Sequence, residues 1–326
     1  MTIGNSPLVV GGRASPLALW QSYLVQERIC KATQTPLDRV PVKGLTSEAD
    51  NDIQTPLSQF TNKGVFTQNL DRALAVNEID LAVHSCKDLP STLPSGLILA
   101  AVLARQHRHD VLVLNDKTNI HSLNDLPAGT RIGTSSVRRR ALLAHHYPHL
   151  VCVEVRGNIQ TRLKHMQSGK ADGLILAAAA LHRLELQDQI AVDLLDWPYA
   201  VSQGALAVVC REDDERSFTI AQQINDPEAF MVCAAERALL RTLEGGCKVP
   251  IGVNADFDAA TGNLTIYGVV VGLDGKTLIE DTLTELCKSN SDAEAIGQKL
   301  GLELKKKGAS ALLQDIRKQV EASAQH

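Results

Sequence analysis

The chain has 326 residues, of which 44% are hydrophobic, 21% charged and 3% aromatic, and its formal net charge is −4. This length allows two or three domains with sizeable cores, and the apolar fraction excludes a mostly disordered chain. The negative net charge argues against a protein that coats nucleic acid, so we expect no nucleic-acid partner.

Neither a membrane span nor a secretory signal is expected. The longest apolar stretch, around residues 173–181, is far too short to cross a bilayer, and the N-terminus lacks a basic region and a long apolar region. The cysteines form no CxxC pair, which predicts reduced thiols and a cytoplasmic protein without a membrane partner. They are Cys30, Cys86, Cys152, Cys210, Cys233, Cys247 and Cys287.

The first two-thirds of the chain alternates between short apolar strands, polar loops and helices. Ser15 followed by Pro16 predicts an N-cap and the first residue of a helix. A second helix is expected to begin at Val137. The expected strands are residues 8–10, 81–83, 131–133, 151–155 and 174–176. Alternating strands and helices indicate α/β layers with mainly parallel sheets.

The last third has a different pattern. A helix is expected to begin at Asp226-Pro227 and to stop at Gly245-Gly246, which leaves Cys247 on the loop beyond. Residues 264–271 and 277–284 then predict a β-hairpin, and a Lys-rich amphipathic helical region follows. This order indicates a smaller α+β domain.

Cationic and hydroxyl side chains collect in the polar loops. These loops follow the carboxyl ends of expected strands, the edge at which open α/β sheets bind ligands, and several of them begin helices whose N-termini attract anions. Each feature taken alone has a plainer explanation, since Arg138–Arg140 can form a solvated helix face and a serine is usually a cap. Together the loops favour a polyanionic small ligand. The residues are Arg13, Ser15, Lys87, Thr134, Ser135, Ser136, Arg138, Arg139, Arg156 and Arg162.

Two single residues are candidates for chemistry. Asp88 directly follows Lys87, and a carboxylate there can stabilise a cation or move a proton; a local cap or a surface ion pair is an equal alternative. Cys247 follows two glycines, which favours an accessible thiol over the usual buried one. The run His145–His149 has no cysteine or carboxylate beside it and predicts a polar helix end, so no metal site is expected.

Seven segments in order resemble the porphobilinogen deaminase, or hydroxymethylbilane synthase, family. The resemblance extends from about residue 8 to residue 252 and is weaker in the C-terminal part. The segments are RASPLALWQ at 13–21, KGVF at 63–66, DLAVHSCKDLP at 80–90, LPAGTRIGTSSVRR at 126–139, RGNIQTRL at 156–163, SQGA at 202–205 and LEGGCKVPIG at 243–252.

The resemblance implies a three-domain monomer. Domain 1 comprises residues 1–104 and 199–220, and domain 2 comprises residues 105–198. Both are expected to be periplasmic-binding-protein-like lobes with mainly parallel sheets, and the chain crosses between them near 104–110 and 197–202. Domain 3, residues 221–326, is the smaller α+β domain that carries the cofactor.

The resemblance also implies an activity. The family joins four porphobilinogen molecules head to tail, releases ammonia at each step and yields hydroxymethylbilane for tetrapyrrole (haem) biosynthesis. Its cofactor is a dipyrromethane, bound through a thioether to the cysteine that matches Cys247. Loss of ammonia leaves an electrophilic azafulvene, and positive charge develops on the pyrrole nitrogens, where a carboxylate can stabilise it. Asp88 matches the family's catalytic aspartate, which hydrogen-bonds those nitrogens.

Each pyrrole brings an acetate and a propionate, which accounts for the arginines. The residues that match cofactor-binding positions are Cys247, Lys87, Asp88, Ser15, Thr134, Ser136, Arg138, Arg139, Arg162 and Arg183. Those that match substrate-binding positions are Arg13, Ser15, Arg156, Arg162, Arg183 and Gln203. Phe66 and Gly204 lie in matching motifs and have less weight.

The chain departs from the family pattern in three places. Thr46–Asp50 contains Glu48 and Ala49 where the family has a basic residue and glycine, so we expect altered loop dynamics or elongation rate. Residues 67–71 and 105–110 also differ, although Arg105 and Asp110 match. An active enzyme is predicted; a non-catalytic anion-binding protein and an inactive deaminase relative are the alternatives.

Overall fold

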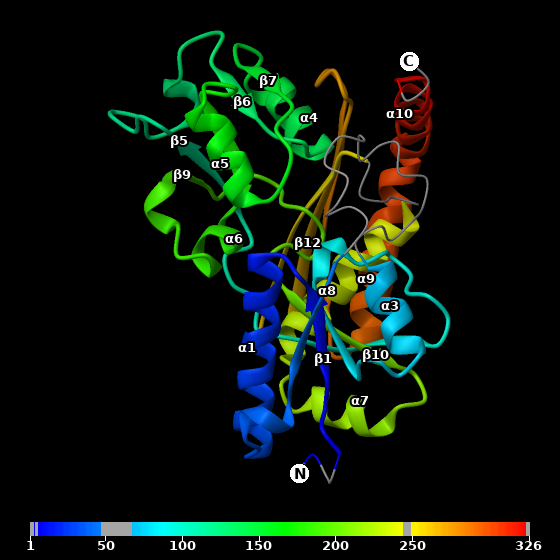
Figure 1. Cartoon of the computed structure of the whole chain (residues 1–326). Helices are drawn as coiled ribbons and strands as arrows, with labels where there is room; N and C mark the ends of the chain where they lie inside the picture. The colour runs from blue at the N-terminus through cyan, green and yellow to red at the C-terminus, as the bar shows by residue number, and fades with distance from the viewer. Residues whose placement is uncertain (1–2, 4–5, 47–66, 244–248, 324–326) are drawn as a thin grey trace. The chain divides into compact units, whose positions relative to one another are not determined.

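The computed structural model describes residues 3, 6–46, 67–243 and 249–323, and it divides the chain into two units. The first unit comprises Met1–Gln106 and Gly204–Met231, and the second comprises His107–Gln203 and Val232–His326 (Figure 1). Each unit is described by itself. The finer division into three domains stays a prediction.

The first unit contains a five-stranded sheet in the order β2-β1-β3-β10-β4. β1 pairs in parallel with β2 and β3, whereas β10 runs antiparallel to β3 and β4. The strands are β1 (Val10–Arg13), β2 (Val42–Leu45), β3 (Leu81–Ser85), β4 (Leu97–Val102) and β10 (Leu206–Arg211). The helices are α1 (Pro16–Thr33), α3 (Gln68–Ala75) and α7 (Glu215–Gln222), with 3-10 turns η1 (Leu37–Arg39) and η2 (Cys86–Asp88).

Helix α1 begins where the sequence predicts. Pro16 stands at its first position, and Ser15 is the N-cap residue with extended backbone, although its side chain makes no capping hydrogen bond. The buried face of α1 carries Val25 and Ile29, which pack into a core with side chains of β1, β3 and β10. Burial of this apolar face holds α1 against the sheet.

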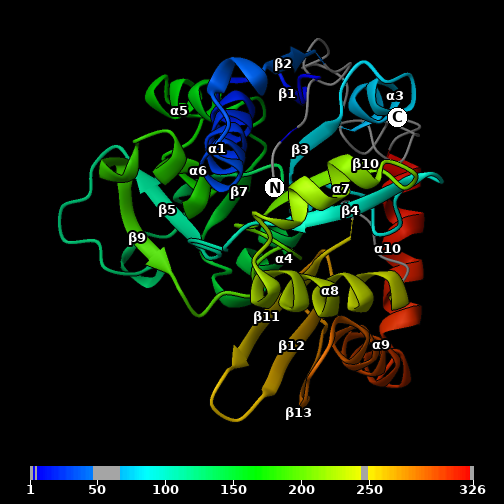
Figure 2. The ribbon, with the colours of Figure 1, turned by 90° about the horizontal axis from the view of Figure 1, so that it is seen from below.

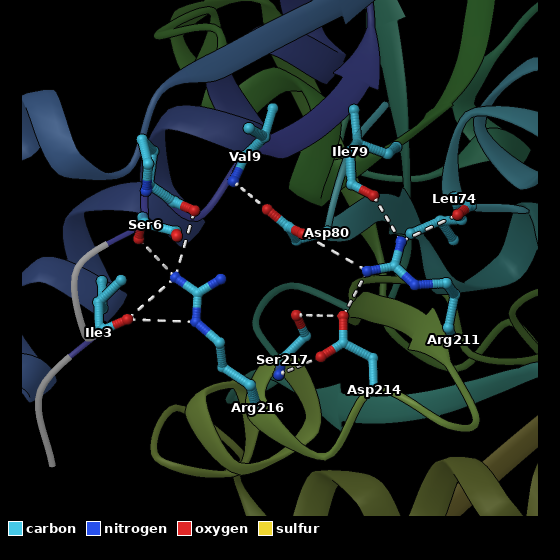
Figure 3. A network of polar contacts seen from close by, with 11 residues as sticks. Ile3, Ser6, Val9, Leu74, Ile79, Asp80, Arg211, Asp214, Arg216 and Ser217 are labelled. Carbon is cyan, nitrogen blue, oxygen red and sulfur yellow. Dashed lines mark hydrogen bonds and ion pairs between the residues drawn. The ribbon is translucent and has the colours of Figure 1, made fainter. Parts of the chain in front are cut away.

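A half-buried polar network links the strands at the amino-terminal edge of β1 and β3 in the same sheet. Arg211, the last residue of β10, donates to the backbone oxygens of Leu74 and Ile79, both at 2.9 Å (Figure 3). Asp80 accepts a hydrogen bond from the backbone nitrogen of Val9 at 2.7 Å and pairs with Arg211 at 3.4 Å. The network holds β1, β3 and β10 in register at the edge opposite the motif loops.

The second unit repeats this strand order as β7-β6-β8-β5-β9. β6 is parallel to β7 and β8, and β5 is antiparallel to β8 and β9. The strands are β5 (Asp110–Leu114), β6 (Arg131–Gly133), β7 (Val151–Val153), β8 (Gly173–Ala177) and β9 (Ile190–Leu194). The helices are α4 (Val137–His146), α5 (Ile159–Gln167) and α6 (Ala178–Arg183), with 3-10 turns η3 (Leu123–Asp125) and η4 (Gln187–Gln189).

Both sheets are mixed, where the sequence predicts mainly parallel ones. Among the described strands, each five-stranded sheet has two parallel and two antiparallel pairings. The antiparallel strand is β10 in one sheet and β5 in the other. Local sequence sets which residues form these strands, but the direction in which a strand joins its sheet depends on the path of the whole chain.

A smaller antiparallel sheet, β11-β12-β13, forms the rest of the second unit (Figure 2). Leu239 of α8 and Leu300 and Leu304 of α9 pack against it around Gly268 of β12. The strands are β11 (Ile251–Asp258), β12 (Asn263–Val271) and β13 (Leu278–Leu286). The helices are α8 (Pro227–Thr242), of which the part from Val232 onward belongs to this unit, α9 (Asn290–Lys306) and α10 (Ala309–Ser323). The expected class, two α/β sheets and a smaller α+β part, is confirmed.

The predicted hairpin is β12 and β13. Its turn is closed by a hydrogen bond from the backbone nitrogen of Gly272 to the backbone oxygen of Thr277 at 2.7 Å. Gly275 has φ of +72°, and a Cβ there would lie 2.5 Å from backbone atoms of Ala144 and His145. Only glycine fits this position, where the turn docks onto the end of α4.

Candidate functional site

The first unit brings four predicted site residues to one edge of its sheet. Arg13 is the last residue of β1, Ser15 caps α1, and Lys87 and Asp88 form η2 directly after β3. Because β1 and β3 are adjacent and parallel, with Val10 opposite Leu81, their carboxyl ends meet at the same edge. All four side chains are half-buried. The predicted juxtaposition of these loops is confirmed within this unit.

The backbone of η2 is anchored to its neighbours. The backbone nitrogen of Cys86 donates to the oxygen of Ala205 at 3.0 Å, because β10 begins beside the end of β3. Gln21 on α1 donates through Nε2 to Ser85 Oγ at 3.0 Å. These contacts fix the position of the turn that carries Lys87 and Asp88.

A buried histidine lies beside Arg13 in the first unit. The His84 side chain on β3 is 5% exposed, and its Nε2 has no hydrogen-bond partner in the described part of the chain. Burial, and then the charge of Arg13, lower the pKa of His84 from 6.5 to about 4. The imidazole is therefore neutral at pH 7 and adds no charge beside Arg13.

We expect His84 to make the protein less stable in acid. A histidine whose pKa is lower in the folded state takes up its proton more readily when unfolded, so stability is lost as pH falls below 6.5. Between pH 7 and about pH 4.5 the wild type loses about 2 kcal/mol more of its unfolding free energy than His84→Gln. Urea unfolding at both pH values measures this difference. His121→Gln, at an exposed histidine, is the control; equal losses in the wild type and His84→Gln would contradict the assignment.

The second unit gathers its own set at the carboxyl ends of β6, β7 and β8. Thr134 follows β6, and its Oγ1 accepts a hydrogen bond from the backbone nitrogen of Ser136 at 3.2 Å. Ser136 in turn caps α4. Arg156 follows β7, and Arg183 ends α6, which follows β8. The three strands are parallel neighbours, so Thr134, Ser136 and Arg156 share one sheet edge, as predicted.

Arg138 and Arg139 turn inward at this edge. Arg138 Nη2 and Arg139 Nη2 lie 2.8 Å and 2.6 Å from the two carboxylate oxygens of Asp110. Both arginines are buried, with 4% and 5% exposure, whereas Arg140 is exposed. The interpretation as a solvated helix face is therefore wrong for Arg138 and Arg139. Asp110 itself was not predicted as a site residue, although it matches the family pattern and directly precedes the apolar run of β5.

Gln203 joins this buried group. Its Nε2 donates to the backbone oxygen of Arg108 at 2.9 Å and to Asp110 Oδ1 at 2.9 Å. These contacts hold the segment before β5. The predicted contact of Gln203 with substrate stays a prediction.

Three further predicted site arginines of the second unit are less buried than this pair. Arg156 Nε lies 3.2 Å from Glu154 Oε1, and Arg162 Nε donates to the backbone oxygen of Gly157 at 2.8 Å. Burial lowers the pKa of Arg183 to about 10, so this half-buried guanidinium still carries its charge at pH 7. All three are cationic groups on segments that follow strands of this sheet.

The buried arginines fit an anionic cofactor. Arg138 Nε and Arg139 Nε are buried and have no hydrogen-bond partner within the described residues. Two guanidinium charges face the single carboxylate of Asp110, so the cluster has one excess positive charge. A buried unpartnered donor is costly, and a carboxylate placed against it relieves both the charge and the missing bond. The acetate and propionate groups of a dipyrromethane have this chemistry.

Several predicted features fall on other parts of the chain. Cys247, Phe66 and residues 47–50 of the atypical loop lie outside the described residues. Over the described ranges, no helix is long and apolar enough to cross a membrane. In those same ranges, no group of three or more His, Cys, Asp or Glu side chains is arranged to hold a metal ion.

Two α/β sheets of one strand order each carry arginine and hydroxyl side chains at the carboxyl edge of their parallel strands. This arrangement is typical of proteins that bind anionic small molecules. A family model described as porphobilinogen deaminase, dipyromethane cofactor binding domain, matches residues 8–219, and the C-terminal domain of the same family matches residues 230–306. The chain belongs to the porphobilinogen deaminase family.

Curated relatives agree with the family models over nearly the whole chain. The porphobilinogen deaminase of Synechococcus elongatus is 43% identical over 316 residues, which are 95% of each chain. That of Syntrophotalea carbinolica is 41% identical over 314 residues, 95% of this chain and 96% of the relative. Among solved structures, the periplasmic VFT2 domain of Bordetella pertussis BvgS matches with a TM-score of 0.40 and 15% identity, covering 67% of this chain and 86% of that one.

Proposed function

We propose that this chain is a transferase that condenses four porphobilinogen molecules head to tail on a dipyrromethane cofactor attached to Cys247. Each condensation releases one ammonia, and a final hydrolysis frees hydroxymethylbilane. The observation that carries the proposal is the placement of the described motif residues: in each unit they share the carboxyl edge of one sheet, in a chain of this family. No observation favours a non-catalytic binding protein.

Asp88 is the catalytic carboxylate in this proposal. It lies half-buried in η2, on a turn held to β10 through Cys86 and Ala205. As a new carbon–carbon bond forms, positive charge develops on the pyrrole nitrogen, and a fixed carboxylate beside it lowers the barrier. Lys87, the preceding residue, binds a carboxylate of the cofactor.

The arginines bind the acetates and propionates. When bound, the dipyrromethane supplies the first two pyrrole rings, to which substrate units are added. Arg138 and Arg139 hold its carboxylates, helped by Thr134 and Ser136 at the start of α4. Arg13, Ser15, Arg156, Arg162, Arg183 and Gln203 take the incoming and growing chain. Because every unit adds two negative charges, the site needs several cationic side chains.

The other cysteines support Cys247 as the attachment residue. Cys86, Cys210, Cys233 and Cys287 are buried, and Cys30 and Cys152 are half-buried. Burial raises the pKa of the Cys30, Cys152, Cys210 and Cys287 thiols, which lowers their thiolate fraction at pH 7. A thiol that must form a thioether needs to be accessible and to have a larger thiolate fraction. The two glycines before Cys247 favour access.

Three further properties belong to the proposal. We infer a monomeric cytoplasmic enzyme without a nucleic-acid partner; the net charge of −4 supports the last point. Light scattering of the purified protein tests the monomer.

The intact mass of the purified protein tests the cofactor and its anchor. The wild type is expected to exceed its sequence mass by two porphobilinogen units less two ammonias, and Cys247→Ser is expected to lose this excess and all turnover. Cys30→Ser, at a half-buried thiol, is the matched control and keeps both. A wild-type protein that remains unmodified after incubation with porphobilinogen would reject the proposed function.

A further inference from the structure

Asp110 occupies a fully buried position at the start of β5. Its carboxylate accepts hydrogen bonds from Arg138 Nη2 at 2.8 Å, Arg139 Nη2 at 2.6 Å and Gln203 Nε2 at 2.9 Å. β5 is paired on both sides, with β8 and with β9. The carboxylate is therefore held on a rigid strand, in contact with two arginines that the proposed function assigns to the cofactor.

These contacts determine the orientation of both guanidinium groups. Arg138 Nη1 donates to the backbone oxygen of Pro198 at 2.6 Å, and Arg139 Nη1 donates to that of Ile175 at 2.8 Å. A guanidinium is planar, so fixing its two Nη atoms also fixes the direction of its Nε–H bond. In each arginine this Nε is the nitrogen left without a partner among the described residues.

The charges of the cluster require a fixed carboxylate. Burial by itself raises the pKa of Asp110, but the charges of Arg138 and Arg139 and their hydrogen bonds outweigh it and hold that pKa well below its ordinary value. Burial lowers the pKa of Arg138, and the charge of Asp110 opposes this. Asp110 thus stays ionised and keeps two adjacent cations together, with one positive charge in excess for a ligand.

We propose that Asp110 is a positioning residue of the ligand site, which aims the Nε–H groups of Arg138 and Arg139 at a carboxylate of the pyrrole cofactor. The inference rests on the proposed function and deepens it, because it names the nitrogen atoms that bind and the residue that directs them. The alternative role for Asp110 is a purely structural ion pair, which stabilises the fold but does not affect the binding of the cofactor.

Cofactor loading of folded protein separates these two roles. Apoprotein variants are incubated with porphobilinogen, and the fraction with the added mass is followed by intact mass spectrometry while circular dichroism monitors the fold. Asp110→Asn, which has nearly the same shape without the charge, is expected to load about 10- to 100-fold more slowly than the wild type. Asp193→Asn is the control and is expected to load normally. Asp193 lies on β9, the strand beside β5, and its half-exposed carboxylate pairs with His109.

Asp110→Glu provides the second arm. It keeps the charge but moves the carboxylate by one methylene, so a positioning role predicts slow loading again, whereas mere charge balance predicts the wild-type rate. The proposal is overturned if the folded variants load at the wild-type rate. It is also overturned if neither variant folds, because Asp110 then forms a structural ion pair. If the wild type itself takes up no porphobilinogen, the proposed function fails instead.

Discussion

Asp88→Asn is expected to lower the rate of porphobilinogen consumption by about 10²- to 10⁴-fold while the cofactor stays attached. Asparagine has the same shape and still offers an oxygen, but it carries no negative charge to offset the cation that develops on the pyrrole nitrogen. Asp88 lies in η2, whose backbone is held by the hydrogen bond between Leu89 and Cys86, so the substitution leaves the turn in place. Turnover and intact mass of the same purified sample measure both parts of the prediction.

Glu212→Gln is the matched control for this substitution. Glu212 is an exposed carboxylate that follows β10, at the sheet edge opposite η2, so its neutralisation leaves turnover unchanged. Near-normal turnover of Asp88→Asn would remove Asp88 from the catalytic role. Loss of the cofactor mass in that variant would show that Asp88 acts in cofactor assembly instead.

Gly297→Ala is expected to destabilise the second unit by about 3 kcal/mol or more. Alanine normally stabilises a helix by about 1 kcal/mol relative to glycine. Here a Cβ on Gly297 of α9 would lie 2.0 Å from the backbone oxygen of Ala235 on α8, so the two helices must separate. Because α8 leads in sequence to Cys247, slower cofactor loading is expected as well. Thermal or urea unfolding measures the loss of stability.

Two further positions on α9 calibrate this effect. Gln298→Ala, at an exposed position, is expected to change the unfolding free energy by less than about 0.5 kcal/mol. Gly301→Ala is intermediate, because its Cβ would meet the side chain of Thr242 at 2.6 Å rather than backbone. If Gly297→Ala proved as stable as the wild type, the close approach of α8 and α9 would be wrong.

Local sequence was sufficient for one strand and one helix start, but it placed the first strand at residues 8–10, whereas β1 is Val10–Arg13. The strand Arg131–Gly133 and the start of α4 at Val137 are confirmed to the residue, because Gly133 ends the run and Ser136 caps the helix. The gathering of motif loops at one edge in each unit is likewise confirmed. That inference needed only the rule that parallel strands place their carboxyl ends together.

The interpretation of Arg138 and Arg139 required the tertiary structure. Their spacing on a helix is equally compatible with a solvated face and with a ligand site, since both patterns place cations in the first turn. Asp110 lies 28 residues before Arg138 and is brought to it only because β5 joins the sheet beside β8. A long-range ion pair of this kind leaves no periodic signal in either segment.

Sequence alone determined the family, the α/β class, the strand Arg131–Gly133 and the starts of α1 and α4, because these follow from motifs, local apolar patterns and caps. Only the tertiary structure decided that β10 is antiparallel to β3 and that β5 is antiparallel to β8. It also decided that Arg138 and Arg139 are buried in ion pairs with Asp110, and that Gly297 lies against α8. The physical reason is that strand direction, burial and helix contact depend on residues far apart in the chain, whose packing is settled by the whole fold.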